Sequence, residues 1–352
     1  GMFSILLYDA DQNKYYIARD RMGIKPLYYL MSTNHIVVSS EIKGIISSGL
    51  YEAKLNGSAI DEYLGNRYVR SPFTFFKDVY QVEPGTYFII NSNREIEKTI
   101  KYWDLPNEFL VSNKYNYKEI SQNFKKMLIQ SVKRRMIADV PLGSYLSGGI
   151  DSSLLSAIAS NEINQSLCTY TIGFKDMNEF KYARLVSQAY STNHNEILLD
   201  EDTYIKNIYD LIKFKDAPLG VPNEIPLALM SKQLKKDMTV VLSGEGADEL
   251  LGGYGRIFRS PFEYEKKPAK TNFYDYFINE YEYVPRNIRD KFLITSKKYR
   301  DYYKQIFLNK YGNVSNEELV FRFFHTYHVK GLLQRVDFTT MYASVEARVP
   351  FL

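Results

Sequence analysis

The sequence predicts an α/β protein with a parallel sheet between flanking helices, preceded by a smaller, antiparallel β-rich region. Three observations carry this prediction. Between residues 142 and 242, strand-like segments alternate with helical ones, which is the pattern of βαβ units. Those strand-like segments are continuously apolar, as expected of strands covered on both faces. The first hundred residues instead hold short strands joined by short turns, which favours antiparallel pairing.

Turn signals and short apolar runs define the antiparallel region, which we expect to form one domain over residues 1–104. A hairpin is predicted around Ser32-Thr33-Asn34, and a strand follows the turn pair Pro84-Gly85. A brief helix near residues 56–65 interrupts the strands. The expected strands are residues 1–9, 14–18, 26–30, 35–39 and 86–90.

A linker is predicted at residues 105–116, because the breaker at Pro106 is followed by a dozen residues without periodicity. Residues 117–352 then form the second domain. It opens with an amphipathic helix over residues 117–137, and residues 256–335 are mostly helical and rich in Tyr and Phe. The expected strands are 142–146, 167–172, 196–199 and 239–242, and the expected helices between them are 152–160, 179–190 and one containing 227–234.

Composition excludes several classes of protein. Among 352 residues, 45 Lys and Arg stand against 41 Asp and Glu, and this small excess does not predict a nucleic-acid or membrane partner. Apolar stretches are strand-length, far short of the roughly 20 residues of a membrane span. Cys168 is the only cysteine, so no intramolecular disulfide forms, which is consistent with a reducing, cytoplasmic setting. A homodimer remains open, because the sequence does not determine the oligomeric state.

The segment Ser147-Gly148-Gly149-Ile150-Asp151-Ser152-Ser153 follows a predicted strand and opens a predicted helix. Its glycines let backbone amides approach an anion, and the hydroxyls and helix N-terminus add donors and partial positive charge. Asp151 would repel a bare phosphate, which indicates an intervening Mg²⁺. A simple capping turn is the alternative, but strand, glycines, carboxylate, hydroxyls and helix coincide here. We therefore expect a phosphate site.

A second segment, Ser243-Gly244-Glu245-Gly246-Ala247-Asp248-Glu249, leaves the last predicted strand. Ligands of open parallel sheets bind beyond the carboxyl ends of the strands. Three carboxylates within five residues repel one another unless a cation or an ammonium group offsets their charge. A solvated acidic turn is the alternative, although such a turn needs no run of glycines directly after a buried strand.

The first segment resembles the pyrophosphate loop of the ATP pyrophosphatases, whose domain is of the adenine nucleotide α-hydrolase type. The second resembles a signature of glutamine-dependent asparagine synthetases. Residues 19–29 and 39–43 are similar to the last part of the glutaminase domain of that family, which uses an N-terminal nucleophile. Residues 344–352 are similar to a motif of its synthetase domain. The resemblance spans the whole chain.

The resemblance implies ATP and Mg²⁺ at the end of the parallel sheet. The positions that match adenosine contacts of the family are Leu146, Ile172, Ser243 and Gly244. The positions that match its pyrophosphate loop are Ser147, Gly148, Gly149, Asp151, Ser152 and Ser153, with Asp151 as the Mg²⁺ ligand. Glu245 and Asp248 match acidic positions beside the activated substrate.

The implied reaction makes an amide from a carboxylate, ATP and ammonia that is released from glutamine. The side-chain carboxylate of aspartate attacks the α-phosphorus of ATP, and Mg-pyrophosphate leaves as β-aspartyl-AMP forms. Ammonia then attacks the acyl group and must lose a proton, so Glu245 is the candidate general base. For Asp248, the alternative role is to hold the amino group of the aspartate substrate.

Departures from the family pattern leave alternatives open. No cysteine precedes Cys168, which we interpret as core packing, so we expect a chain cut at both ends that does not hydrolyse glutamine alone. The catalytic lysine beyond the Pro-Phe-Leu motif has no match. Pro222 and Asn223 stand where well-known members carry an arginine. A related amidotransferase acting on another carboxylate, such as a sugar acid, therefore stays open, as does a non-catalytic nucleotide-binding partner.

Two other features carry less functional weight. His325 and His328 lie three apart without carboxylate or cysteine partners at ligand spacing, so partly buried packing is favoured over a metal pair. The aromatic runs at residues 274–277 and 321–324 lack a basic stripe, so we expect helical core packing rather than base stacking.

Overall fold

A computed structural model describes residues 1–32, 34–106, 116–266, 271–293 and 298–352. The chain forms two compact units, each built from two segments. The first unit comprises Gly1–Leu105 and Asp248–Gln334, and the second comprises Pro106–Ala247 and Arg335–Leu352. Residues 248–334, which the sequence assigns to the second domain, thus cluster with the first 105 residues. Most of the predicted linker lies outside the described residues, and the domain boundaries stay a prediction.

A five-stranded parallel sheet forms the centre of the second unit, which confirms the predicted α/β class. The strand order is β10-β9-β8-β11-β12, and every neighbouring pair is parallel. The strands are β8 (Leu142–Tyr145), β9 (Cys168–Phe174), β10 (Asn193–Leu199), β11 (Val240–Leu242) and β12 (Glu346–Arg348). β12 is absent from the predicted strands, because it is only three residues long, is charged at both ends and contains no apolar run.

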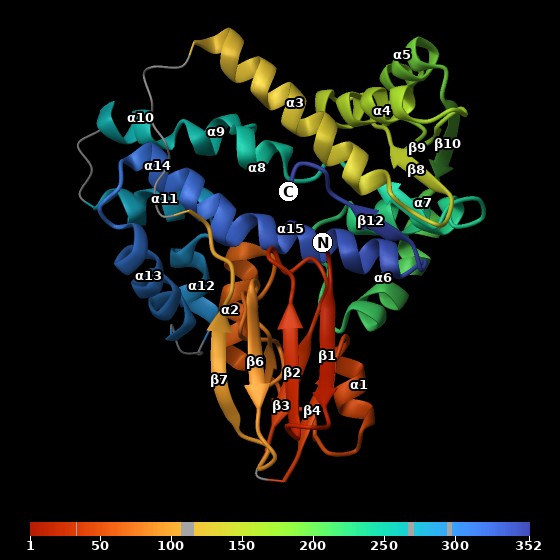
Figure 1. Cartoon of the computed structure of the whole chain (residues 1–352). Coiled ribbons are helices and arrows are strands. Elements are labelled where there is room, and N and C mark those ends of the chain that lie inside the picture. The colour runs from red at the N-terminus through yellow and green to blue at the C-terminus, as the bar shows by residue number, and fades with distance from the viewer. Residues whose placement is uncertain (33, 107–115, 267–270, 294–297) are drawn as a thin grey trace. The chain divides into compact units, whose positions relative to one another are not determined.

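Helices cover both faces of this sheet (Figure 1). On one face, Leu128 and Val132 pack with Leu155 and Leu242. On the other, Tyr145, Tyr170 and Val241 pack against Leu234 and Val336 in a separate buried cluster. The helices are α3 (Tyr117–Met136), α4 (Ile150–Glu162), α5 (Phe180–Tyr190), α6 (Glu201–Lys215), α7 (Glu224–Leu234) and α15 (Val329–Met341), whose first residues belong to the first unit.

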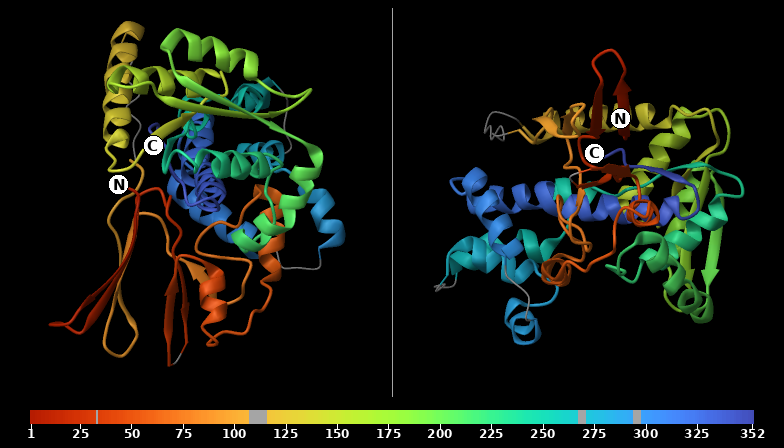
Figure 2. Two further views of the ribbon diagram at one scale, coloured as in Figure 1. Left: turned by 90° about the vertical axis from the view of Figure 1, so that its right-hand side faces the viewer. Right: turned by 90° about the horizontal axis from the view of Figure 1, so that it is seen from below.

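Two antiparallel sheets form the β part of the first unit, in the orders β1-β2-β6-β7 and β4-β3-β5. This confirms the predicted antiparallel region. The left view of Figure 2 shows the sheets as two layers, and Ile17, Leu27, Val82 and Phe88 share one buried cluster. The strands are β1 (Ser4–Asp9), β2 (Lys14–Arg19), β3 (Tyr28–Met31), β4 (Ile36–Ser39), β5 (Val79–Gln81), β6 (Thr86–Ile90) and β7 (Ile96–Lys101).

Aromatic side chains dominate the helical part of the first unit. Phe277, Phe307, Phe323 and Phe324 are buried in one cluster, which confirms core packing for the aromatic runs. A π-helix, Phe324–His328, joins α14 to α15. The helices are α1 (Ile42–Ser47), α2 (Gly57–Asn66), α8 (Ala247–Leu251), α9 (Gly255–Phe258), α10 (Ser260–Lys266), α11 (Phe273–Tyr281), α12 (Arg286–Phe292), α13 (Lys298–Tyr311) and α14 (Asn316–Phe323).

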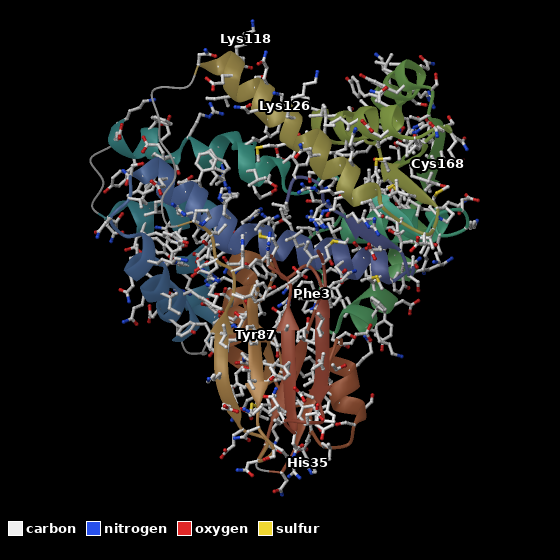
Figure 3. All side chains as sticks on the ribbon, viewed as in Figure 1. Phe3, His35, Tyr87, Lys118, Lys126 and Cys168 are labelled. Carbon is white, nitrogen blue, oxygen red and sulfur yellow. The ribbon has the colours of Figure 1, made fainter. Side chains whose placement is uncertain are left out.

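The single cysteine and the two neighbouring histidines pack inside their own units. Cys168, marked in Figure 3, begins β9 and packs half-buried against the cluster of Tyr145 and Tyr170. His325 Nε2 lies 3.1 Å from the backbone oxygen of Glu249, and His328 Nδ1 lies 2.8 Å from the hydroxyl of Tyr281. Across the described residues, no helix has the length and hydropathy of a bilayer-crossing segment.

Candidate active site

Both motif segments begin where the strands of the parallel sheet end, on the side that we call its loop edge. β8 and β11 are hydrogen-bonded neighbours, with Leu242 opposite Ser144, so their carboxyl ends point the same way. The two following loops touch. A Cβ built at Gly244 would lie 3.3 Å from Asp151 Cβ and 3.3 Å from the backbone nitrogen of Ser152. Glycine at residue 244 thus permits the close approach of the second loop to the first.

The first loop is held by its own serines. Ser147 Oγ lies 3.1 Å from Ser152 Oγ and accepts a 3.1 Å hydrogen bond from the backbone of Gly149. Gly148 adopts a φ of +86°, and a Cβ there would lie 2.5 Å from Tyr182 Cβ. Only glycine suits this position, because the backbone is left-handed and there is no room for a Cβ atom.

The first turn of α4 provides the features of an anion site. The first amides of a helix have no partners within that helix, and Gly149 at the N-cap brings no side-chain oxygen to satisfy them. Ser153 Oγ is buried and lacks a hydrogen-bond partner among the described residues. Asp151 lies in this same turn. Amide and hydroxyl donors with one carboxylate fit a phosphate chain carrying a divalent cation.

The four predicted adenosine positions lie on neighbouring strands or directly after them. Leu146 is fully buried, and its backbone nitrogen donates a 2.9 Å hydrogen bond to the oxygen of Tyr170 on β9. Ile172 lies on β9 as well. Ser243 is 5% exposed and donates from its backbone to the oxygen of Arg348, 2.9 Å away. Together with Gly244 they lie at or near the edge that carries the loops. Their contact with adenosine stays a prediction.

Glu245 has a partner that the sequence did not reveal. Its Oε1 lies 2.7 Å from Nη2 of Arg335, and the two side chains are 25% and 14% exposed. Arg335 lies in the part of α15 that belongs to the second unit. The residues are ninety positions apart, so no local pattern links them. The contact with Arg335 gives this carboxylate a defined orientation, and its partial exposure leaves it open to a ligand.

Asp248 belongs to the first unit, where its surroundings are also rich in glycine. Its backbone oxygen accepts hydrogen bonds of 2.9 Å from the nitrogens of both Gly252 and Gly253. A Cβ at Gly253 would lie only 1.7 Å from Asp248 Oδ1. Gly253 therefore leaves room for the carboxylate where it stands, and Gly252 has a φ of +76°, which favours glycine.

The segment after α6, which departs from the family pattern at Pro222 and Asn223, is organised by a buried ion pair. Lys215 Nζ lies 2.8 Å from Glu224 Oε2, and Glu224 also accepts hydrogen bonds from the backbones of Gly220 and Val221. Burial lowers the pKa of Lys215, Glu224 raises it, and the charge of Arg335 lowers it further. Glu224 therefore holds the segment together, and this segment lies within electrostatic reach of the Arg335–Glu245 pair.

Comparison with protein families gives two matches that together cover nearly the whole chain. The family model described as asparagine synthase matches residues 123–352, and the one described as glutamine amidotransferase domain matches residues 1–103. The first range contains both loops of the candidate site as well as Arg335.

Individual relatives agree with these matches. Asparagine synthetase [glutamine-hydrolyzing] 1 of Bacillus subtilis is 29% identical over 388 residues, covering 100% of this chain and 60% of that protein. A putative asparagine synthetase [glutamine-hydrolyzing] 2 of Methanocaldococcus jannaschii is 32% identical over 72% of this chain and 50% of its own length. An NH3-dependent NAD synthetase structure from Campylobacter jejuni has 16% identity over 60% of this chain and 95% of its own, with a TM-score of 0.32.

The chain spans about half to 60% of the length of these two curated relatives. The asparagine synthase model nevertheless matches well over half of its residues, including the two loops that meet at the edge of the parallel sheet. The chain belongs to the asparagine synthase family.

Proposed function

We propose that the chain supports ATP-dependent amide synthesis, which converts aspartate to asparagine through β-aspartyl-AMP. The observation that carries the proposal is the contact between the two loops at Gly244 and Asp151. It brings a phosphate-binding helix terminus and an acidic loop to one edge of the sheet. Adenylate chemistry needs such an arrangement, because the nucleotide and the attacking carboxylate have to meet at one phosphorus atom.

The first loop would grip the departing pyrophosphate. Open amides at the start of α4 and the unpartnered Ser153 hydroxyl are donors for its oxygens. Asp151 would hold Mg²⁺, which supplies charge neutralisation for the pyrophosphate when it is bound. Hydrogen bonds among Ser147, Gly149 and Ser152 support the shape of this loop, and Gly148 leaves no room for a side chain.

The second loop would handle the acceptor and the ammonia. Once the acyl-adenylate has formed, ammonia attacks its carbonyl carbon, AMP leaves, and the attacking nitrogen gives up a proton. Glu245 is the candidate base, and Arg335 orients it across their 2.7 Å contact. Asp248 is the candidate partner for the amino group of the aspartate substrate. Ammonia would come from glutamine in the whole protein, since residues 1–103 match a glutamine amidotransferase model.

Substrate-dependent exchange between ATP and labelled pyrophosphate tests the proposal directly. We expect exchange with the chain when aspartate and Mg²⁺ are present, and none when aspartate is omitted. Asp151→Asn should abolish the exchange, and Lys98→Gln, at an exposed position on β7 of the first unit, should retain it. Aspartate-independent ATP binding without any exchange would contradict catalysis and favour a non-catalytic nucleotide-binding partner.

Amidation of another carboxylate is the second candidate function. It is favoured by Pro222 and Asn223, which stand where the family resemblance leads us to expect an arginine. Tyr204 donates a hydrogen bond of 3.0 Å to the backbone oxygen of Pro222, so this segment is fixed in place. Exchange that stays silent with aspartate but appears with a sugar acid would support this candidate.

A further inference from the structure

A cavity of about 110 Å³ is lined entirely by residues of the first unit. Its walls come from the β5–β6 turn, the residues after β7, α13 and the π-helix. Five cationic side chains line it against two carboxylates. The cations are Arg21, Arg70, Lys101, Lys310 and Lys330, and the carboxylates are Glu83 and Asp104.

Most of these charges are already paired. Asp104 Oδ2 lies 3.0 Å from Lys101 Nζ and 2.5 Å from Lys310 Nζ. Arg70 makes a two-pronged ion pair with Glu62, in which one of the two contacts is 2.9 Å long. Lys101 and Lys310 share the single carboxylate of Asp104, so this group keeps one net positive charge, whereas the charge of Arg70 is balanced by Glu62.

Three charged side chains of the lining have no hydrogen bond or ion pair to any described residue: Arg21, Lys330 and Glu83. Arg21 and Glu83 are exposed, and Lys330 is partly buried. Burial is the chief reason that the pKa of Lys330 falls to about 8, although Glu83 raises it. Two cations against one carboxylate leave an excess of positive charge, which a bound anion would balance.

The remaining walls are apolar and limit the size of the occupant. Trp103, Ile306 and Phe307 face a space somewhat smaller than the ~150 Å³ that holds a benzene molecule in a protein interior. A phosphate ion has no hydrocarbon part and would make no apolar contact with these walls. An anion with a short hydrocarbon body would use the cations and the apolar walls together.

We propose that this cavity binds a short-chain monocarboxylate, with its carboxylate against Lys330 and Arg21 and its hydrocarbon part against Trp103 and Phe307. The site is distinct from the proposed ATP-dependent site, and its occupancy does not depend on that proposal. Glu83 weakens the affinity for the anion because it carries the same charge as the ligand.

Isothermal titration of the chain with butyrate tests this, with butyramide as a neutral ligand of the same shape. We expect butyrate to bind more tightly than butyramide at neutral pH. Lys330→Met should weaken butyrate binding by about tenfold, and Glu83→Gln should tighten it severalfold. The matched control Lys98→Met, on the exposed face of β7, should leave the affinity unchanged.

Raising the pH gives an independent readout. Butyrate binding should weaken as the pH rises through about 8, because Lys330 then loses its proton. The charged groups acting on Lys330 are Glu83, Asp104, Lys101 and Arg19. If Lys330 is the titrating group, the affinity of the Lys330→Met variant for butyrate should not fall near pH 8. Equal affinities for butyrate and butyramide, or a Lys330→Met variant that binds butyrate normally, would overturn the proposal.

Discussion

The loop edge of the parallel sheet and the aromatic helical layer of the first unit hold their charges in opposite ways. At the loop edge, Glu245 and Arg335 are paired but partly open to solvent. In the helical layer, Arg70 and Glu62 are paired and buried, with the guanidinium 3.9 Å from the ring centroid of Tyr303. Each charge of the buried pair needs the other, because an unpaired charge in the interior destabilises the fold. The partly exposed pair instead leaves Glu245 accessible to a ligand.

The largest expected effect lies in the helical layer. Glu62→Gln leaves Arg70 as an uncompensated buried charge, which should lower the free energy of unfolding by about 3–5 kcal/mol. Chemical denaturation measures this change. Glu97→Gln is the matched control, since it removes a solvent-exposed partner 2.8 Å from Lys14 and should have far less effect. Equal losses in the two variants would show that burial is not what distinguishes the pairs.

At the loop edge the matching change should affect the reaction rather than stability. Glu245→Gln keeps a hydrogen-bond partner for Arg335 but removes the base, so amide formation at saturating ammonia should fall about 10²- to 10³-fold. Pyrophosphate exchange should persist, because adenylate formation precedes the proton transfer. Unchanged amide formation from ammonia would show that another group takes the proton.

Backbone strain provides a third comparison within the phosphate loop itself. Gly148→Ala places a methyl group against Tyr182 in a left-handed conformation, so pyrophosphate exchange should fall at least tenfold, with a loss of about 1–3 kcal/mol in stability. Gly149→Ala should cost less, because its backbone is not left-handed and a Cβ there would meet only Ser147 Oγ, at 3.2 Å. A larger defect in Gly149→Ala would mean that close approach of the nucleotide matters more than the shape of the loop.

The smallest expected effect concerns the edge strand β10. Burial lowers the pKa of His194, with Glu196 raising it and Arg184 lowering it. The unfolded chain therefore binds a proton at higher pH than the folded one. The free energy of unfolding should decline as the pH falls below about 6.5, the ordinary histidine value. His194→Gln should reduce this decline in denaturation curves, and the exposed His35→Gln should not.

Sequence reasoning found what is encoded locally. The strand β11 follows from a continuous apolar run, β8 and β9 follow from short, mostly apolar segments between helical ones, and the glycine-rich loop follows from residues within a single stretch of chain. Arg335 was missed, because its partner lies ninety residues away and only the packing of α15 brings them together. β12 was missed for a related reason, since Glu-Ala-Arg becomes a strand only by pairing with β11. The ion pair of Lys215 and Glu224 likewise needs the turn between α6 and α7 to exist first.

The position of β12 has a consequence for how the protein is made. Ser243, at the start of the acidic loop, bonds to Arg348, and Gly246 packs against Leu352. The loop is therefore completed only after residues from the far end of this sequence have left the ribosome. Contacts of such long sequence separation form slowly, so the unfinished site spends part of synthesis as an open sheet edge at β11. Chains whose synthesis stops before residue 346 lack β12, so β11 stays unpaired on one side. Such chains should be candidates for chaperone binding.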